Sequence, residues 1–433
     1  MKKWLLVLFI VAAVSQANAQ QKLTLADAIA ISLKNSYDIE LVRNQLAISN
    51  INNNPGVAGA LPTINLNASD NEQIISINQK FPDANRNTQR NNVGSNILQM
   101  GVTGTMLLYN GNRVVTTQKR LAQLELLNKN VLNAQLQNTM ALVSVRYYEI
   151  VRQQELLKTI QKSIAVFQKR LDVLEARKEA GLANNADIYQ AKLDLNQQKQ
   201  ALETQYLIIK QSKADLLQSM VQAPDSVIVV EDKIAIDKNL SLENIKATLP
   251  SNPDYMAAAT QITINQLIEK ETAALRMPSL RATTGFNLNS NKSAAGFILL
   301  NQSYGPFFGV NLSVPLYNGS VFKRQGQVAA INTRSAKLQQ ENLALTLETN
   351  AVKTFNAYTN AITQMQTEAD NYALSGQLLD LVMQKFELAQ ATIIEVRQAQ
   401  QSFENAGYRL VNLQYTAKIA EIELNRLGSK LAL

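Results

Sequence analysis

The chain has 433 residues, a formal net charge of +8, and neither histidine nor cysteine. The two absences exclude Ser-His-Asp and Cys-His catalytic groups, ordinary zinc, haem and iron–sulfur sites, and disulfide bonds. Charged residues make up only 18% of the chain and aromatic residues 6%, whereas Ala, Leu, Gln and Asn are abundant, so the composition favours long helices.

The first residues have the pattern of a secretory signal peptide. Lys2 and Lys3 precede an eleven-residue apolar stretch, and a small-x-small cleavage sequence follows at residues 17–19. The apolar stretch is too short to span a membrane. We therefore expect residues 1–19 to be removed and the protein to be exported. No later segment has eighteen consecutive apolar residues, so a membrane-spanning part would have to consist of β-strands.

Two sets of landmarks recur along the chain in the same order. The sequence Leu-Tyr-Asn-Gly at 108–111 recurs at 316–319, and an acidic-aliphatic-x-Gln-Ala pattern at 187–191 recurs at 395–399. Both pairs are separated by 208 residues. A fixed offset between several landmarks predicts an internal tandem repeat.

The repeat predicts the domain organisation. We expect a first repeat over residues 20–221, a linker over 222–240 that includes the β-prone run Ser226–Val230, and a second repeat over 241–433. Each repeat should contain a helix, a strand pair, a long helix and another helix. The strand pairs are expected at about 61–109 and 279–317.

Long coiled-coil helices are predicted by a 3.5-residue apolar period. Apolar or small residues step by four and three from Ala351 to Phe386, and a similar run extends from Leu157 to Leu174. No proline interrupts residues 319–388. A simple coiled-coil rod would explain these helices, but it would not explain the segments that alternate with period two.

Four segments of about ten residues alternate apolar residues with small polar ones. This length suits a tilted strand that crosses a bilayer, and polar loops at about 71–96 and 291–303 should join the strands in pairs. A β-sandwich with one solvated face is the alternative, but four strands between long helices have no partner for their apolar face. The alternation predicts these lipid-facing residues: Leu280, Phe286, Val310 and Leu312.

Four strands cannot close a barrel alone. The sequence therefore predicts an oligomer.

The chain resembles the TolC-type outer membrane efflux proteins over essentially the whole mature chain. The resemblance rests on the signal peptide, the duplicated Pro–strand–loop–strand–Leu-Tyr-Asn-Gly layout and the break at residues 181–188.

The resemblance implies a mainly α fold with a small β-barrel part. Long coiled-coil helical hairpins would form a tunnel in the periplasm, and residues 222–240 would belong to a small equatorial region around it. Four transmembrane strands per chain would complete a twelve-stranded barrel in a homotrimer. The implied function is the outer membrane exit duct of a tripartite efflux system that conducts small molecules passively. The implied partners are a periplasmic adaptor (membrane fusion protein), an inner-membrane pump and outer membrane lipid.

The resemblance also places a periplasmic aperture on five residues. Asp187 and Glu395 correspond to the family's acidic positions, and Gln398 stands where a second ring carboxylate is usual. Phe386 replaces a tyrosine and Ala391 an arginine, so the polar latch of the family is missing. A glycine at the second helix turn is replaced by alanine. Alternatively, the two carboxylates only face the dipole at a helix N-terminus.

Other functions remain as alternatives at this stage. The duct could serve type I protein secretion, or metal ions, although the nine Met residues are scattered. The chain could be a periplasmic coiled-coil adaptor without a pore. We expect no enzyme activity, catalytic residues, metal site or cofactor. We also expect no nucleic-acid partner, because Lys and Arg are spread along the helices of an exported protein.

Overall fold

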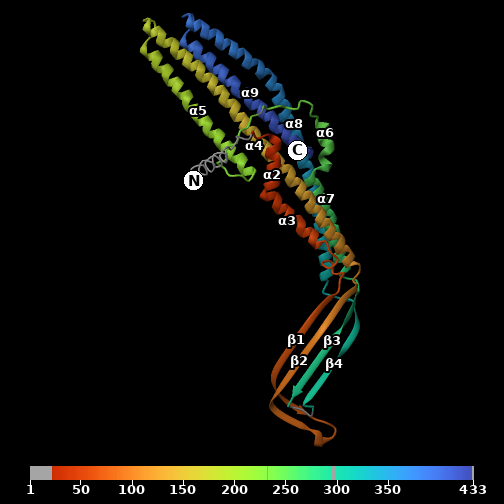
Figure 1. Ribbon diagram of the computed structural model, residues 1–433. Helices are drawn as coiled ribbons and strands as arrows, with labels where there is room; N and C mark the ends of the chain where they lie inside the picture. Colours follow the sequence, from red (N-terminus) through yellow and green to blue (C-terminus); the bar gives the residue numbers. More distant parts are fainter. Residues whose placement is uncertain (1–21, 232, 295–297, 432–433) are drawn as a thin grey trace, which may run out of the picture. The chain divides into compact units, whose positions relative to one another are not determined.

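A computed structural model describes residues 22–231, 233–294 and 298–431. The described chain is mainly helical with one antiparallel sheet (Figure 1). It divides into a helical unit and a unit that contains the sheet. The helical unit comprises residues 1–44, 130–256 and 341–433, and the sheet unit comprises 45–129 and 257–340. The expected signal peptide, residues 1–19, lies outside the described residues.

The elements follow the predicted order in each half of the chain. The first half contains helices α2 (Leu25–Asn35) and α3 (Tyr37–Asn52), strands β1 (Thr63–Gln79) and β2 (Thr88–Tyr109), and helices α4 (Arg113–Glu179) and α5 (Asn185–Ser219). The second half contains helices α6 (Leu242–Thr248) and α7 (Pro253–Ala274), strands β3 (Ser279–Ser293) and β4 (Leu300–Ser313), and helices α8 (Val321–Glu387) and α9 (Ile393–Leu427). No helix among the described residues is long and apolar enough to cross a membrane.

The two halves correspond closely in length. Helices α4 and α8 both have 67 residues, and α5 and α9 both have 35. Each pair begins and ends at positions 208 residues apart. Residues with positive φ occur at the same offset, as Gly111 and Gly319 (67° and 65°) and as Gly181 and Ala389 (74° and 62°).

The sheet has the strand order β1-β2-β3-β4, with every neighbouring pair antiparallel. Its register aligns the alternating residues of all four strands, so that one face is apolar and the other polar. One such row contains Leu66, Val102, Phe286 and Pro306, and the adjacent row on the opposite face contains Asn67, Gly101, Asn287 and Gly305. The predicted period of two is therefore confirmed in each strand.

The strands are longer than the sequence predicted. The polar segment 71–96 was expected to be a loop, but β1 continues to Gln79 and β2 already begins at Thr88. Asn-rich segments have low strand propensity, yet their backbone groups still pair across the hairpin. In Figure 1 this β1–β2 hairpin extends beyond the β3–β4 hairpin.

In the helical unit, the predicted coiled-coil seams are buried. Tyr358, Leu379 and Met383 of α8 are buried, as the 3.5-residue period requires. The seam departs from the prediction at one position, where Glu368 is buried and Ala369 is exposed, because Glu368 pairs with Arg409 at 2.9 Å.

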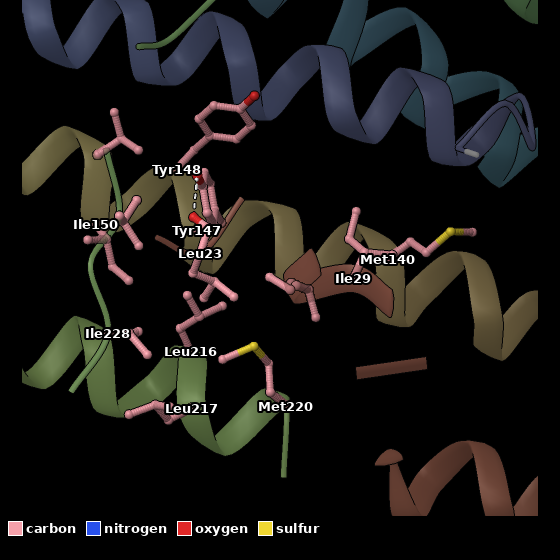
Figure 2. Packing of buried hydrophobic residues seen from close by; sticks show 14 of the residues in the cluster. Leu23, Ile29, Met140, Tyr147, Tyr148, Ile150, Leu216, Leu217, Met220 and Ile228 are labelled. Atoms are coloured by element: carbon pink, nitrogen blue, oxygen red, sulfur yellow. Dashed lines mark hydrogen bonds between the residues drawn. The ribbon is translucent and has the colours of Figure 1, made fainter. Parts of the chain in front are cut away.

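A second core lies between α2, α4, α5 and the segment that follows α5. Leu23 and Ile29 pack against Met140 and Tyr147 of α4 and Leu216 of α5. Figure 2 shows the Tyr147 hydroxyl pointing at the carbonyl of Leu23, to which it donates a hydrogen bond of 3.1 Å. This contact ties the start of the described chain to the long helix.

In the segment 222–240, the β-prone run Ser226–Val230 takes no part in the four-stranded sheet. Val229 forms only an isolated parallel bridge with Lys22. Ile228 and Val230 are buried against α4 and α5 instead. Ile228 and Val230 thus serve as core residues of the helical unit.

Candidate functional site

The turn between α8 and α9 and the turn between α4 and α5 carry most of the predicted site residues. Asp187 lies in the first turn of α5, where its backbone N–H donates to the side chain of Asn184 at 2.8 Å. Glu395 lies at the equivalent place in α9 and forms a capping box with Thr392. Both carboxylates therefore occupy helix N-termini, where the helix dipole favours negative charge.

The capping box determines the ionisation of Glu395. Its carboxylate accepts a hydrogen bond from the backbone N–H of Thr392 at 2.7 Å and from the Thr392 hydroxyl at 2.9 Å. Both bonds lower the pKa of Glu395, and the bond from the backbone N–H has the larger effect. The side chain is exposed and stays ionised at neutral pH.

Both helix turns end in the same hydrogen-bond pattern. Gly181 N–H donates to the carbonyl of Lys178 at 2.9 Å, and Ala389 N–H donates to the carbonyl of Phe386 at 3.1 Å. This is the motif in which the residue after the helix adopts a left-handed conformation, usually as glycine. Because Ala389 has a Cβ and a φ of 62°, its turn is strained relative to that of Gly181.

Phe386 is part of the hydrophobic core of this chain. It is 1% exposed and packs in a cluster with residues of α4, α5 and α9. The guanidinium of Arg177 lies 4.3 Å from the centroid of its ring, and the same group donates a hydrogen bond to the Phe386 carbonyl. Arg177 at the end of α4 thus holds the end of α8.

The two remaining predicted aperture residues have different surroundings. Ala391 is half-buried against the same cluster, and Gln398 is exposed on α9. Among the described residues, no hydrogen bond joins Asp187 to Phe386 or Ala391, so the structure does not bring these three together in one polar group.

A buried arginine links three helices near these turns, and the sequence analysis missed it. The Arg170 side chain of α4 is 0% exposed. Its guanidinium lies 2.5 Å from the carboxylate of Asp194 on α5 and 3.0 Å from the side-chain oxygen of Gln400 on α9. The exposed Arg397 of α9 approaches the same carboxylate oxygen at 3.1 Å.

The charges in this network favour one ionisation state. Burial lowers the pKa of Arg170, and the hydrogen bond and charge of Asp194 oppose that shift. Burial would raise the pKa of Asp194, but hydrogen bonds from Gln190 and Arg170 and the charge of Arg397 outweigh it and lower the pKa. Asp194 is therefore an ionised counter-charge shared by two arginines.

An exposed ion pair adds a further link between α4 and α8. The Lys169 ammonium lies 2.5 Å from the carboxylate of Glu387. Together with Arg177 and Arg170, Lys169 gives α4 three contacts to the second helical hairpin. No sequence motif predicts these contacts. Arg177 and Lys169 each contact a residue that is more than 200 positions away in the chain.

No metal site accompanies this arrangement. Within the described residues, no three His, Cys, Asp or Glu side chains are grouped so that they could hold a metal ion. The chemistry of the site is that of helix–helix contacts and fixed charges.

Part of the chain matches a known protein family. Residues 244–428 match the outer membrane efflux protein family. Over 346 residues the chain is 23% identical to the outer membrane protein TolC of Vibrio cholerae, covering 77% of this chain and 76% of TolC. The second half of the chain thus matches the outer membrane efflux protein family, and most of the chain is similar to TolC, as the sequence resemblance predicted.

The fold of this efflux protein agrees with solved structures. The outer membrane protein VceC of Vibrio cholerae superposes with a TM-score of 0.78 at 17% identity, covering 93% of this chain and 96% of VceC. The CmeC outer membrane channel of Campylobacter jejuni gives 0.76 at 14% identity, covering 94% and 85%. The predicted location is confirmed: the efflux protein resides in the outer membrane, and its helical tunnel part extends into the periplasm.

The apolar face of the efflux protein's sheet carries all four residues predicted to face lipid. Leu280 pairs with Leu312 in the register, and Phe286 and Val310 follow on the same face. Val310 is 52% exposed, and Phe286 and Leu312 are also exposed, whereas Leu280 is partly covered. The four side chains share one face, and lipid contact on that face stays a prediction.

Proposed function

We propose that this efflux protein is a homotrimeric exit duct that conducts small molecules passively across the outer membrane. In this proposal it works with a periplasmic adaptor and an inner-membrane pump. The observation that carries the proposal is the sheet, which has two chemically distinct faces and two unpaired edges.

The unpaired edges favour an assembly of three chains. Among the described residues, β1 pairs only with β2, and β4 pairs only with β3. Unpaired backbone groups are very costly in lipid, so such edges must join other strands. Three copies supply twelve strands, which is enough to close a barrel around a water-filled lumen.

The height of the apolar face fits a bilayer. Apolar or weakly polar residues on this face extend in β3 from Leu280 to Leu288. This distance is about 27 Å along the strand, or roughly 21 Å along the membrane normal at a tilt of about 40°. Outer membrane barrels have an apolar band of about 25 Å. Beyond it, the same face becomes polar at Asp70 and Glu72, which both bind Asn96.

The helices also present surfaces that a second copy would cover. On α8, three leucines at heptad-like spacing are exposed although they are large and apolar: Leu374, Leu378 and Leu381. Leu388, directly after the helix, is exposed as well. Exposed apolar stripes of this spacing are typical of coiled-coil partners. We infer that neighbouring chains of the trimer pack against this face.

The tandem repeat and its domains are part of the proposal. The equal helix lengths and the matched positive-φ residues support two repeats over 20–221 and 241–433 with a linker at 222–240. With six such repeats, a trimer would have a nearly sixfold arrangement of helical hairpins.

The aperture is proposed at the turns after α4 and α8. Three copies of Glu395 around the axis would form an acidic ring, and Asp187 would add charge nearby. The missing polar latch is compensated within each chain by Arg177, which contacts Phe386, and by the Arg170–Asp194–Gln400 network.

Mass and conductance measurements test the proposed duct. In detergent the protein should be a trimer, and in planar bilayers it should form ion-conducting pores. A monodisperse monomer that needs no detergent would contradict the duct and favour a periplasmic adaptor without a pore. Reconstitution with candidate adaptors then tests the tripartite role.

A further inference from the structure

The polar face of the sheet is almost free of charge. In the register rows from Thr63 to Gln73 of β1 and across β2, β3 and β4, its residues are mainly Asn, Gln, Ser, Thr and Gly. No charged residue lies on this face in these rows; Arg281 of β3 is on the same face but one row beyond Thr63, opposite Leu107 and Asn311. It lies six residues from Asn287, or about 20 Å along the strand. The centre of this face therefore neither attracts nor repels a charged solute through charged side chains.

A hollow of about 270 Å³ lies at the centre of this face. Its floor is Gly101, and its walls carry the side-chain amides of four residues: Asn67, Gln99, Asn287 and Asn289. A Cβ added at Gly101 would lie 2.4 Å from the side-chain oxygen of Asn287, so the hollow exists because this residue is glycine.

The amides around the hollow have unused hydrogen-bonding capacity. No hydrogen bond joins the side chain of Asn67, Gln99, Asn287 or Asn289 to another of the residues that the structure describes. Each amide offers one acceptor oxygen and two N–H donors. The hollow therefore presents donors and acceptors side by side, without a net charge.

An aromatic ring adjoins the hollow on the same face. Phe307 lies opposite Gly285 in the register, one row from Gly101 and Asn287. A Cβ added at Gly285 would be 2.9 Å from the Phe307 ring, so the ring lies across this glycine. Among the described strand residues, Phe307 is the one phenylalanine on the mainly polar face, whereas its neighbour Phe308 points to the apolar face and is 76% exposed.

We propose that this hollow, with Phe307, is a binding site for neutral, hydroxyl-rich solutes of the oligosaccharide class. Sugar hydroxyls donate and accept, as the amides do, and the C–H face of a sugar ring can pack against the electron-rich face of an aromatic ring. An ion would find no opposite charge here, and an apolar solute would cover unpaired amides at a cost. The site deepens the proposed duct function, on which it rests, because only a closed barrel turns this face toward a lumen.

Single-channel current in planar bilayers tests the site with maltohexaose as the probe. Millimolar maltohexaose should cause reversible, concentration-dependent interruptions of the current. Polyethylene glycol of similar size is the control for simple volume exclusion, and it should cause at least fivefold fewer interruptions. Equal effects of the two polymers would overturn the proposal while leaving the duct intact. An absence of conductance would instead contradict the duct itself.

Two pairs of variants connect the effect to the hollow. Phe307→Ala and Gly101→Ala should each weaken maltohexaose block at least fivefold. The matched controls, Phe308→Ala and Gly104→Ala, alter the opposite face and should leave block unchanged. Trimer mass and open-channel conductance confirm that each variant has assembled. Unchanged block in assembled Phe307→Ala and Gly101→Ala channels would overturn the proposed site.

Discussion

Many apolar side chains are buried in the helical unit, whereas many are exposed in the sheet unit, as two phenylalanines show. Phe386 at the end of α8 is 1% exposed, whereas Phe308 in β4 is 76% exposed. The helices cover much of their apolar surface within one chain, and the sheet covers neither face. The helical unit thus has a core of its own, while in the proposed duct lipid and further copies of the chain would cover the sheet.

The largest expected loss of stability comes from removing the counter-charge in the helical unit. Asp194→Ala leaves the guanidinium of Arg170 buried without a carboxylate, which typically costs about 3–5 kcal/mol. Thermal or urea unfolding of the detergent-solubilised protein measures the loss. Asp172→Ala on the exposed face of α4 is the control and should change stability by less than about 0.5 kcal/mol.

The same ion pair predicts the acid sensitivity of the helical unit. The pKa of Asp194 is lowered in the folded state, so its stabilisation is complete above the unfolded value of about 3.9 and declines as pH falls through the folded pKa. The stability difference between wild type and Asp194→Ala should therefore shrink below about pH 4. A difference that stays constant down to pH 2 would contradict this account.

The next largest effect is expected in the sheet, and it distinguishes the two faces. Val310→Arg places a charge on the apolar face and should cost about 2–4 kcal/mol per chain if that face meets the bilayer centre. Asn311→Arg, one residue further on the polar face, should be tolerated. Folding into lipid vesicles measures both. If Val310→Arg inserts normally and Asn311→Arg does not, the two faces are assigned in reverse.

The smallest effect on stability, but a clear one on function, is expected at Glu395. In a trimer, three carboxylates near the axis should attract cations, so Glu395→Ala should reduce the cation preference of the pore. The variant also loses the capping box and should melt slightly earlier. Gln398→Ala is the control, since it alters neither charge nor cap. If Glu395→Ala lowers the melting temperature and leaves ion selectivity unchanged, Glu395 acts only as a helix cap.

Periodicity predicted most of the fold because it depends on local geometry. The period of two assigned Leu280, Phe286, Val310 and Leu312 to one face, and the register confirms that they share it. The 3.5-residue period located the helical seams, and the outer membrane location was confirmed by the family match. The strand content of residues 71–96 was missed, since Asn and Gln side chains give no strand signal even when the backbone pairs.

The contacts that hold the helix turns together could not be predicted from local patterns. Arg177 and Phe386 are 209 residues apart, and nothing near either residue identifies the other. Arg170 is next to the predicted seam position Leu171 of α4, and only its three-dimensional neighbours explain its burial. Of the predicted aperture residues, Phe386 is buried and Glu395 is a capping residue, while their role around a pore axis stays a prediction.

The matched lengths of the helices have a consequence for how this protein can change during evolution. Helices α4 and α8 have 67 residues each, and α5 and α9 have 35 each. One inserted residue would rotate everything beyond it by about 100° around the helix axis and turn the buried seam outward. A hairpin can therefore be lengthened only by a whole heptad in both of its helices, and its counterpart in the other half must grow by the same amount. Substitutions can accumulate until the two halves share little sequence, but insertions and deletions must occur in pairs.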